Sequence, residues 1–181
     1  MMNLFKIQNG WSVLAIILAW QIAGALFFAF GPYQAINEMT PDTIPEERFN
    51  YEPDELTSWL DSLGDSGRDL YQQFQLWDVV NAAVTAVALT IGLTFTLGRL
   101  FPADHYMHTF RQLPALVFVL ELLENALLYF NASSFPDLVG GSIVPITTTL
   151  KLFFGFGTML FFLATVVWLI VNYFRQRSTK G

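Results

Sequence analysis

Four long apolar stretches, separated by polar segments, constrain this chain more than any other feature. They cover residues 11–31, 76–98, 113–131 and 146–173. A helix of about 20 residues is roughly 30 Å long, which matches the hydrocarbon core of a bilayer. Only 13% of the residues are charged, whereas a soluble domain has about 25%. The sequence therefore predicts an all-α integral membrane protein, built as a bundle of four transmembrane helices.

The first apolar stretch has an alternative interpretation as a cleaved signal peptide. The apolar region of a signal peptide is normally about 7–15 residues long and ends at a small-residue cleavage site. This stretch is longer and ends in the sequence FFAFGP. We therefore expect it to remain as a helix, and we expect residues 1–181 to form a single membrane domain.

The distribution of charge predicts the orientation of the four spans. Positive residues occur before the first span, between the second and third spans and after the fourth: Lys6, Arg99, Arg111, Arg175, Arg177 and Lys180. Ten of the 15 acidic residues lie between residues 32 and 75, and the segment 131–145 has no lysine or arginine. By the positive-inside rule, both termini are cytoplasmic and the loop 32–75 is external. The predicted location is a plasma membrane or a bacterial inner membrane.

The external loop 32–75 has two parts with different patterns. Residues 35–50 contain Thr-Pro and Ile-Pro steps, which predict an irregular loop. Apolar residues then follow helical spacing at Leu56, Trp59, Leu60 and Leu63. This spacing predicts a short amphipathic helix at residues 54–63, with Gly64 as its C-terminal stop. A new helix is expected from Gly67, continuing without a break into the second span.

Three polar residues, Glu121, Glu124 and Asn125, lie in the middle of the third apolar stretch. An ionised side chain at the centre of a membrane helix costs about 2.5–3.5 kcal/mol on insertion scales. The three residues fall within about 100° of arc on one helix face. We therefore expect them to face the bundle interior, where other groups compensate their charge.

Polar residues on the second and fourth spans lie at compatible depths. With a rise of about 1.5 Å per residue, the polar groups lie between the midplane and the outer half of the bundle. We expect Lys151 to pair with Glu124 or Asp78, and the helix at residues 54–63 to lie near the external opening. The candidate ligand-binding residues are Asp78, Asn81, Glu121, Glu124, Asn125 and Lys151.

These residues leave three functions open. The first is a pocket for a lipid-like or isoprenoid-like ligand, or an enzyme on such a substrate with Glu121 and Glu124 as acid and base. The second is a proton- or cation-coupled transporter. The third is an accessory subunit whose buried polar network only fixes the helix register. Expected partners are membrane lipids, a lipid-like ligand and a homo-oligomer or larger membrane complex; an acidic chain without a basic patch argues against nucleic acid.

The sequence predicts no cofactor and no metal. It contains no cysteine, which excludes disulfides and thiolate metal sites. Asp104, His105 and His108 are the candidates for a metal site, because histidines three residues apart can share a helix face. Without a third strong ligand, the alternative is a pair of exposed histidines at the membrane interface.

Overall fold

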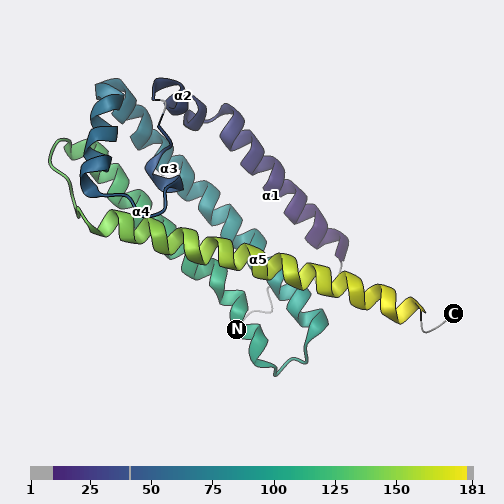
Figure 1. Ribbon diagram of the computed structural model, residues 1–181. Coiled ribbons are helices and arrows are strands. Elements are labelled where there is room, and N and C mark those ends of the chain that lie inside the picture. Colours follow the sequence, from purple (N-terminus) through teal and green to yellow (C-terminus); the bar gives the residue numbers. More distant parts are fainter. Residues whose placement is uncertain (1–9, 41, 179–181) are drawn as a thin grey trace, which may run out of the picture.

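The computed structural model describes residues 10–40 and 42–178, and all regular structure within these ranges is helical (Figure 1). The elements are α1 (Gly10–Phe30), α2 (Pro32–Met39), η1 (Pro45–Glu47), α3 (Pro53–Leu100), η2 (Tyr106–Gln112), α4 (Leu113–Ser134) and α5 (Ile143–Ser178). Four segments of the described residues are long and apolar enough to cross a membrane: Gly10–Met39, Pro53–Leu100, Tyr106–Ser134 and Ile143–Gln176. The predicted all-α class with four long apolar helices is confirmed. Lys6, Lys180 and the side chain of Arg177, which contributed to the predicted orientation, lie outside the described part.

Helix α3 consists of two helical segments that meet at Gly64. This residue has φ 64° and ψ −178°, a conformation that is essentially restricted to glycine. The chain reverses its direction at Gly64. Arg68 stabilises this reversal, since its guanidinium donates to the carbonyl of Leu60 at 3.0 Å and pairs with Asp65. The predicted short helix and its stop at Gly64 are confirmed, although the second segment resumes directly after Gly64 rather than at Gly67.

The short segment of α3 packs back against the start of the long segment. Trp59 on the first segment and Tyr71 on the second have ring centroids 4.7 Å apart. The apolar face that the spacing predicted is buried: Leu56, Trp59, Leu60 and Leu63 all belong to one hydrophobic cluster. In Figure 1 the dark blue segment runs up to the reversal, from which the long segment descends.

The prediction of an irregular loop from residue 35 was wrong for its first residues, which belong to α2. Pro32 occupies the first turn of this helix, where its fixed φ suits a helix start. Ile36 is fully buried in the cluster that also holds the short segment of α3. A single buried anchor therefore makes a helix that apolar periodicity over eight residues could not identify.

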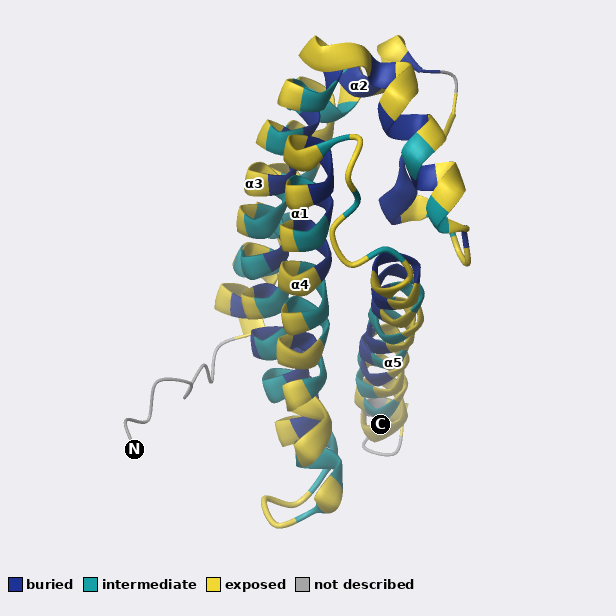
Figure 2. Ribbon diagram, turned by 90° about the vertical axis from the view of Figure 1, so that its left-hand side faces the viewer, coloured by how far each residue is buried: buried dark blue, intermediate teal, exposed yellow. Residues whose placement is uncertain are grey.

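Helix α3 is the central element, since it contacts α1, α2, α4 and α5. Helices α1, α3 and α4 run alongside one another, and α5 crosses them obliquely (Figures 1 and 2). The indole of Trp20 on α1 donates to the hydroxyl of Thr85 on α3 at 2.8 Å. Helix α5 approaches α3 closely at Gly92, where an added Cβ would lie 2.6 Å from the ring of Phe162.

Two apolar clusters divide the bundle along its length. The first joins α2, both segments of α3 and the adjacent ends of α4 and α5, and includes Tyr71 and Leu128. The second lies nearer the other end, around Leu93 and Phe162. Gln75 on α3, Glu124 and Asn125 on α4, and Lys151 on α5 are buried and fall between these clusters along their helices, whereas Thr96, Asn131 and Thr165 lie alongside cluster residues. The fold therefore encloses a polar layer between two apolar ones.

Candidate functional site

The ammonium of Lys151 is the centre of this polar layer. It lies 2.6 Å from Oε2 of Glu124 and 3.7 Å from Oε2 of Glu121, and it donates to the backbone carbonyl of Glu46 at 3.2 Å. An ammonium has three donors, and three oxygens surround this one. Lys151 is 6% exposed and Glu124 is 0% exposed, so the pair is shielded from solvent. The predicted pairing of Lys151 with Glu124 is confirmed.

The sequence suggested Asp78 as an alternative partner of Lys151, but in the structure Asp78 bonds to Asn125 instead. The amide Nδ2 of Asn125 donates to Oδ2 of Asp78 at 3.1 Å, which links α4 to α3. Together with the contacts of Lys151, this bond brings the polar stripes of three helices to one place. The six candidate residues are therefore close together, and their binding of a ligand stays a prediction.

Glu46 is a member of the site that sequence reasoning missed. It lies in η1, it is 5% exposed, and its Oε1 accepts from Tyr71 Oη at 2.7 Å and from Gln75 Nε2. Burial raises the pKa of this carboxyl to about 7, with the nearby charge of Glu124 adding to the effect. Its second oxygen, Oε2, has no hydrogen-bond partner. Glu46 is one of ten acids between residues 32 and 75, and nothing in its sequence context distinguishes it from the exposed ones.

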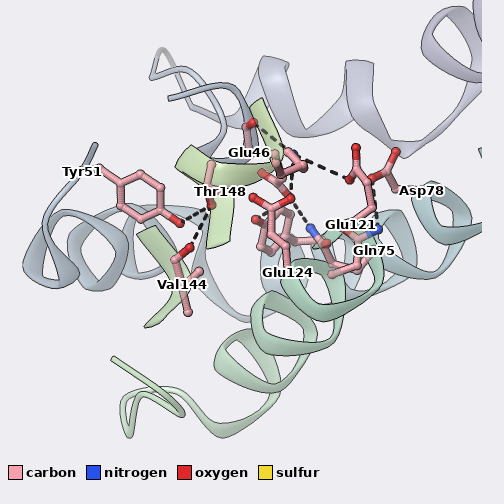
Figure 3. Close-up of polar contacts among 11 residues, drawn as sticks. Glu46, Tyr51, Gln75, Asp78, Glu121, Glu124, Val144 and Thr148 are labelled. Atoms are coloured by element: carbon pink, nitrogen blue, oxygen red, sulfur yellow. Dashed lines mark hydrogen bonds and ion pairs between the residues drawn. The ribbon is translucent and has the colours of Figure 1, made fainter. Parts of the chain in front are cut away.

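The segment that carries Glu46 is fastened to α5 by hydroxyl contacts. We call residues 44–51 the strap. The hydroxyls of Tyr51 and Thr148 lie 3.3 Å apart, and Thr148 donates to the carbonyl of Val144 (Figure 3). Because the single proton of Thr148 is already used, Tyr51 donates to Thr148. Burial also raises the pKa of Tyr51, which keeps it a donor. The strap is therefore held over the polar layer at both ends.

A pocket of about 280 Å³ opens beside this layer. Its polar lining includes Glu46, Asp78, Asn81, Glu121 and Lys151. Glu124 and Asn125 do not line the pocket. They contact residues that line it, since Glu124 pairs with Lys151 and Asn125 donates to Asp78. Four of the six predicted residues thus face the pocket, and two lie behind it.

A second cavity of about 140 Å³ lies next to the first, between α3 and α4. The two share Asn81 and Glu121. Beyond these residues the lining is almost wholly apolar and includes Leu89, Val117 and Phe118. The cavity near the strap is therefore the more polar of the two, and the one towards the middle of the bundle is the more apolar.

The candidate metal residues lie far from this site, in the turn between α3 and α4. His105 Nδ1 accepts from the backbone N–H of Met107 at 3.2 Å, and His108 Nε2 lies 2.9 Å from the carbonyl of Pro102. Among residues 10–40 and 42–178, no group of three or more metal-ligating side chains is placed to hold an ion. Both histidines shape the turn.

No protein-family model, no curated protein and no solved structure matches this chain.

Proposed function

We propose that this chain is a multi-pass membrane protein that binds a lipid-like ligand beside the strap. The observation that carries the proposal is the pair of adjacent cavities that share Asn81 and Glu121, one lined by several charged residues and the other mainly by apolar ones. Ligand sites combine an apolar surface with a few placed polar groups that fix orientation. A molecule with a polar head and an apolar chain complements this arrangement.

Membrane insertion is supported by the outward faces of the long helices. In the 21 residues of α1 only Val13 is buried, and large apolar side chains on the other helices are also exposed (Figure 2). A soluble monomer rarely exposes continuous apolar surface of this extent. We place both termini in the cytoplasm and the strap on the external side, because Arg99 and Arg111 flank the connection at the opposite end of the bundle. This orientation suits a plasma membrane or a bacterial inner membrane.

The geometry favours a binding pocket over the other two functions. A transporter needs a polar route through the bundle, but the lining turns apolar beyond Glu121. An enzyme with Glu121 and Glu124 as acid and base needs both carboxyls at the substrate, yet Glu124 is fully buried behind Lys151. A purely structural network would leave both the cavity and the unpartnered oxygen of Glu46 without an explanation.

Two glycines of α5 provide a matched test. Gly155 lines the pocket, and the nearest side-chain atom to an added Cβ is 3.8 Å away, whereas Gly157 has nothing within 4 Å and faces outwards. A leucine at position 155 fills the pocket, and a leucine at position 157 does not. Mass spectrometry of the protein purified in mild detergent should find a lipid-like molecule with the parent and with Gly157→Leu, but not with Gly155→Leu. A parent protein that folds and retains no such molecule would contradict the proposal in favour of a structural network.

A further inference from the structure

The pocket is surrounded by more negative than positive charge. Four carboxylates, the buried ones of Glu46 and Glu124 and the partly buried ones of Asp78 and Glu121, surround a single ammonium, that of Lys151. The ammonium already pairs with Glu124 at 2.6 Å and Glu121 at 3.7 Å, and it donates to the carbonyl of Glu46. When ionised, the carboxylates leave a negative excess away from water, and buried charge without a partner costs several kcal/mol. A cation in the pocket would remove this cost, and an anionic head group would increase it.

Several buried oxygens of the polar layer lack a hydrogen-bond partner, and the one on Glu46 points to a donor supplied from outside the protein. Glu46 lines the pocket and is 5% exposed, and its Oε2 accepts no hydrogen bond. Buried polar atoms in native structures nearly always have a partner. Oε1 of the same carboxyl is satisfied by Tyr71 and Gln75, so Oε2 is the oxygen of this carboxyl that lacks a donor.

The remaining lining selects an organic cation over a metal ion. The rings of Phe28, Phe74 and Phe156 line the same pocket, and aromatic faces attract ammonium groups that have lost their water. Within the described ranges, no three carboxylates or imidazoles are placed to hold a metal ion. An ammonium of several atoms can contact carboxylates and rings that lie too far apart to ligate one metal.

We propose that the pocket binds the ammonium head group of an amphiphilic amine, whose apolar chain lies in the cavity between α3 and α4. This inference rests on the proposed lipid-like ligand and adds the charge of its head. The head donates to Oε2 of Glu46 and lies against Asp78 and Glu121. The chain follows α3 from Asn81 to Leu89, a helix length of about 12 Å. The ammonium has two sources, an amine-headed lipid of the bilayer or a free amphiphilic amine.

Three ligands with one chain and different heads test the assignment: n-decylamine, n-decanol and n-decanoate. Binding to the intact protein is measured by calorimetry in maltoside micelles, with the unfolding temperature as a second readout. Decylamine should bind about tenfold or more tightly than decanol, and decanoate should bind most weakly. If decanol or decanoate matches decylamine, the ammonium assignment is overturned while the lipid-like pocket stands. If none of the three binds to the folded protein, both proposals fall.

Substitution of Glu46 provides the internal control. In Glu46→Gln the amide oxygen still accepts from Tyr71 and Gln75, so the strap stays in place, but the negative charge is lost. Decylamine affinity should fall about tenfold with little change for decanol. The same substitution at Glu38, which is exposed on α2 and outside the pocket, should leave both affinities unchanged. An unaltered decylamine preference in Glu46→Gln would overturn the proposal.

Nanodiscs distinguish the two sources of the ammonium. If the natural ligand is an amine-headed lipid, phosphatidylethanolamine competes for the pocket, and decylamine binds more weakly there than in phosphatidylglycerol discs. If the ligand is a free amine, the two lipids give equal decylamine affinities. For a protein that prefers decylamine over decanol and decanoate, the two results assign the ammonium to different molecules.

Discussion

At the scale of single residues, Lys151 determines whether the polar layer can exist inside the bundle. Its removal leaves Glu124 fully buried with no cation beside it. Breaking a buried ion pair by deleting one partner typically costs about 3–5 kcal/mol. We therefore expect Lys151→Met to lower the unfolding temperature sharply in detergent, measured by the intrinsic fluorescence of the protein.

The matched control for Lys151→Met removes the orphaned charge as well. In the double variant Lys151→Met/Glu124→Leu the fully buried anion is removed together with its cation, and only the partly exposed Glu121 loses a partner. Apolar replacement of a whole buried pair is often close to neutral. The double variant should therefore recover much of the stability that the single variant loses. Equal losses in both proteins would mean that packing around the Lys151 side chain, rather than charge pairing, accounts for the effect.

Glu46 should make the stability of the ligand-free protein depend on pH. Its pKa is raised from 4.5 to about 7, so the folded state holds this proton more tightly than the unfolded state. The folded protein therefore loses stability as the pH rises from about 4.5 to about 7, by about 3 kcal/mol in total, and no more above that range. The charged and titratable groups that interact with this carboxyl are Glu121, Glu124, Lys151, Tyr51 and Tyr71.

Glu46→Gln isolates this contribution from the other titrations, because glutamine keeps the acceptor and cannot ionise. Unfolding temperatures of parent and variant should agree near about pH 5, and the variant should be the more stable near about pH 8. A difference that is constant over this range would exclude Glu46 as the titrating group.

The residues of the site differ in how far the sequence could predict them. Glu121, Glu124 and Lys151 were identifiable because a charge inside an apolar stretch is costly and must be compensated. Glu46 and Tyr51 carried no such signal, since polar residues in a polar loop are ordinarily solvated. Their burial depends on where the strap folds, which is a property of tertiary packing.

At the scale of elements, the reversal in α3 depends on one glycine. Gly64 has φ 64° and ψ −178°, and nothing lies within 4 Å of a Cβ placed there. A cost on substitution would therefore come from the backbone alone. We expect Gly64→Ala to destabilise the protein by about 1–3 kcal/mol, as measured by thermal unfolding.

Gly157 on α5 is the control for Gly64. It also has nothing within 4 Å of an added Cβ, but it lies inside a regular helix. Alanine is favoured over glycine in a helix interior by about 0.5–1 kcal/mol, so Gly157→Ala should be neutral or stabilising. A Gly64→Ala variant as stable as Gly157→Ala would show that the reversal tolerates a side chain.

The same elements show which patterns predict structure and which do not. The spacing of Leu56, Trp59, Leu60 and Leu63 repeats over two turns, and the helix it predicted is present. Helix α2 has eight residues and one buried side chain, Ile36. Helical apolar spacing can be recognised only when it repeats over more than one turn. Short helices with a single buried side chain are therefore not predicted from it.

At the scale of the whole molecule, periodicity places each polar stripe on its helix but does not fix how the helices rotate against one another. Rotation here follows from packing, including the close approach of α5 to α3 at Gly92 and the bond from Trp20 to Thr85. For this reason the sequence could propose that Asp78, Glu121 and Lys151 meet, but it could not choose between Asp78 and Glu124 as the partner of Lys151.

The orientation of the molecule decides which compartment supplies the ligand, and the chain is well suited to measuring it. It contains no cysteine, so each introduced cysteine is the only reactive thiol. Asp61, on the short segment of α3, and Asp104, in the turn between α3 and α4, are both exposed and lie at opposite ends of the bundle. With the strap on the external side, a membrane-impermeant maleimide should label Asp61→Cys in intact cells.

Asp104→Cys should react with the same reagent only after the membrane is permeabilised, because the positive-inside rule places Arg99 and Arg111 on its side in the cytoplasm. The reverse pattern would put the pocket on the cytoplasmic side without altering its chemistry. Labelling of both thiols in intact cells would mean that the long segment of α3 does not cross the membrane, and the orientation would then have to be abandoned. Since the pocket lies between the strap and the middle of the bundle, the expected pattern means that a water-borne amine reaches it from outside the cell, whereas a bilayer lipid reaches it from the outer leaflet.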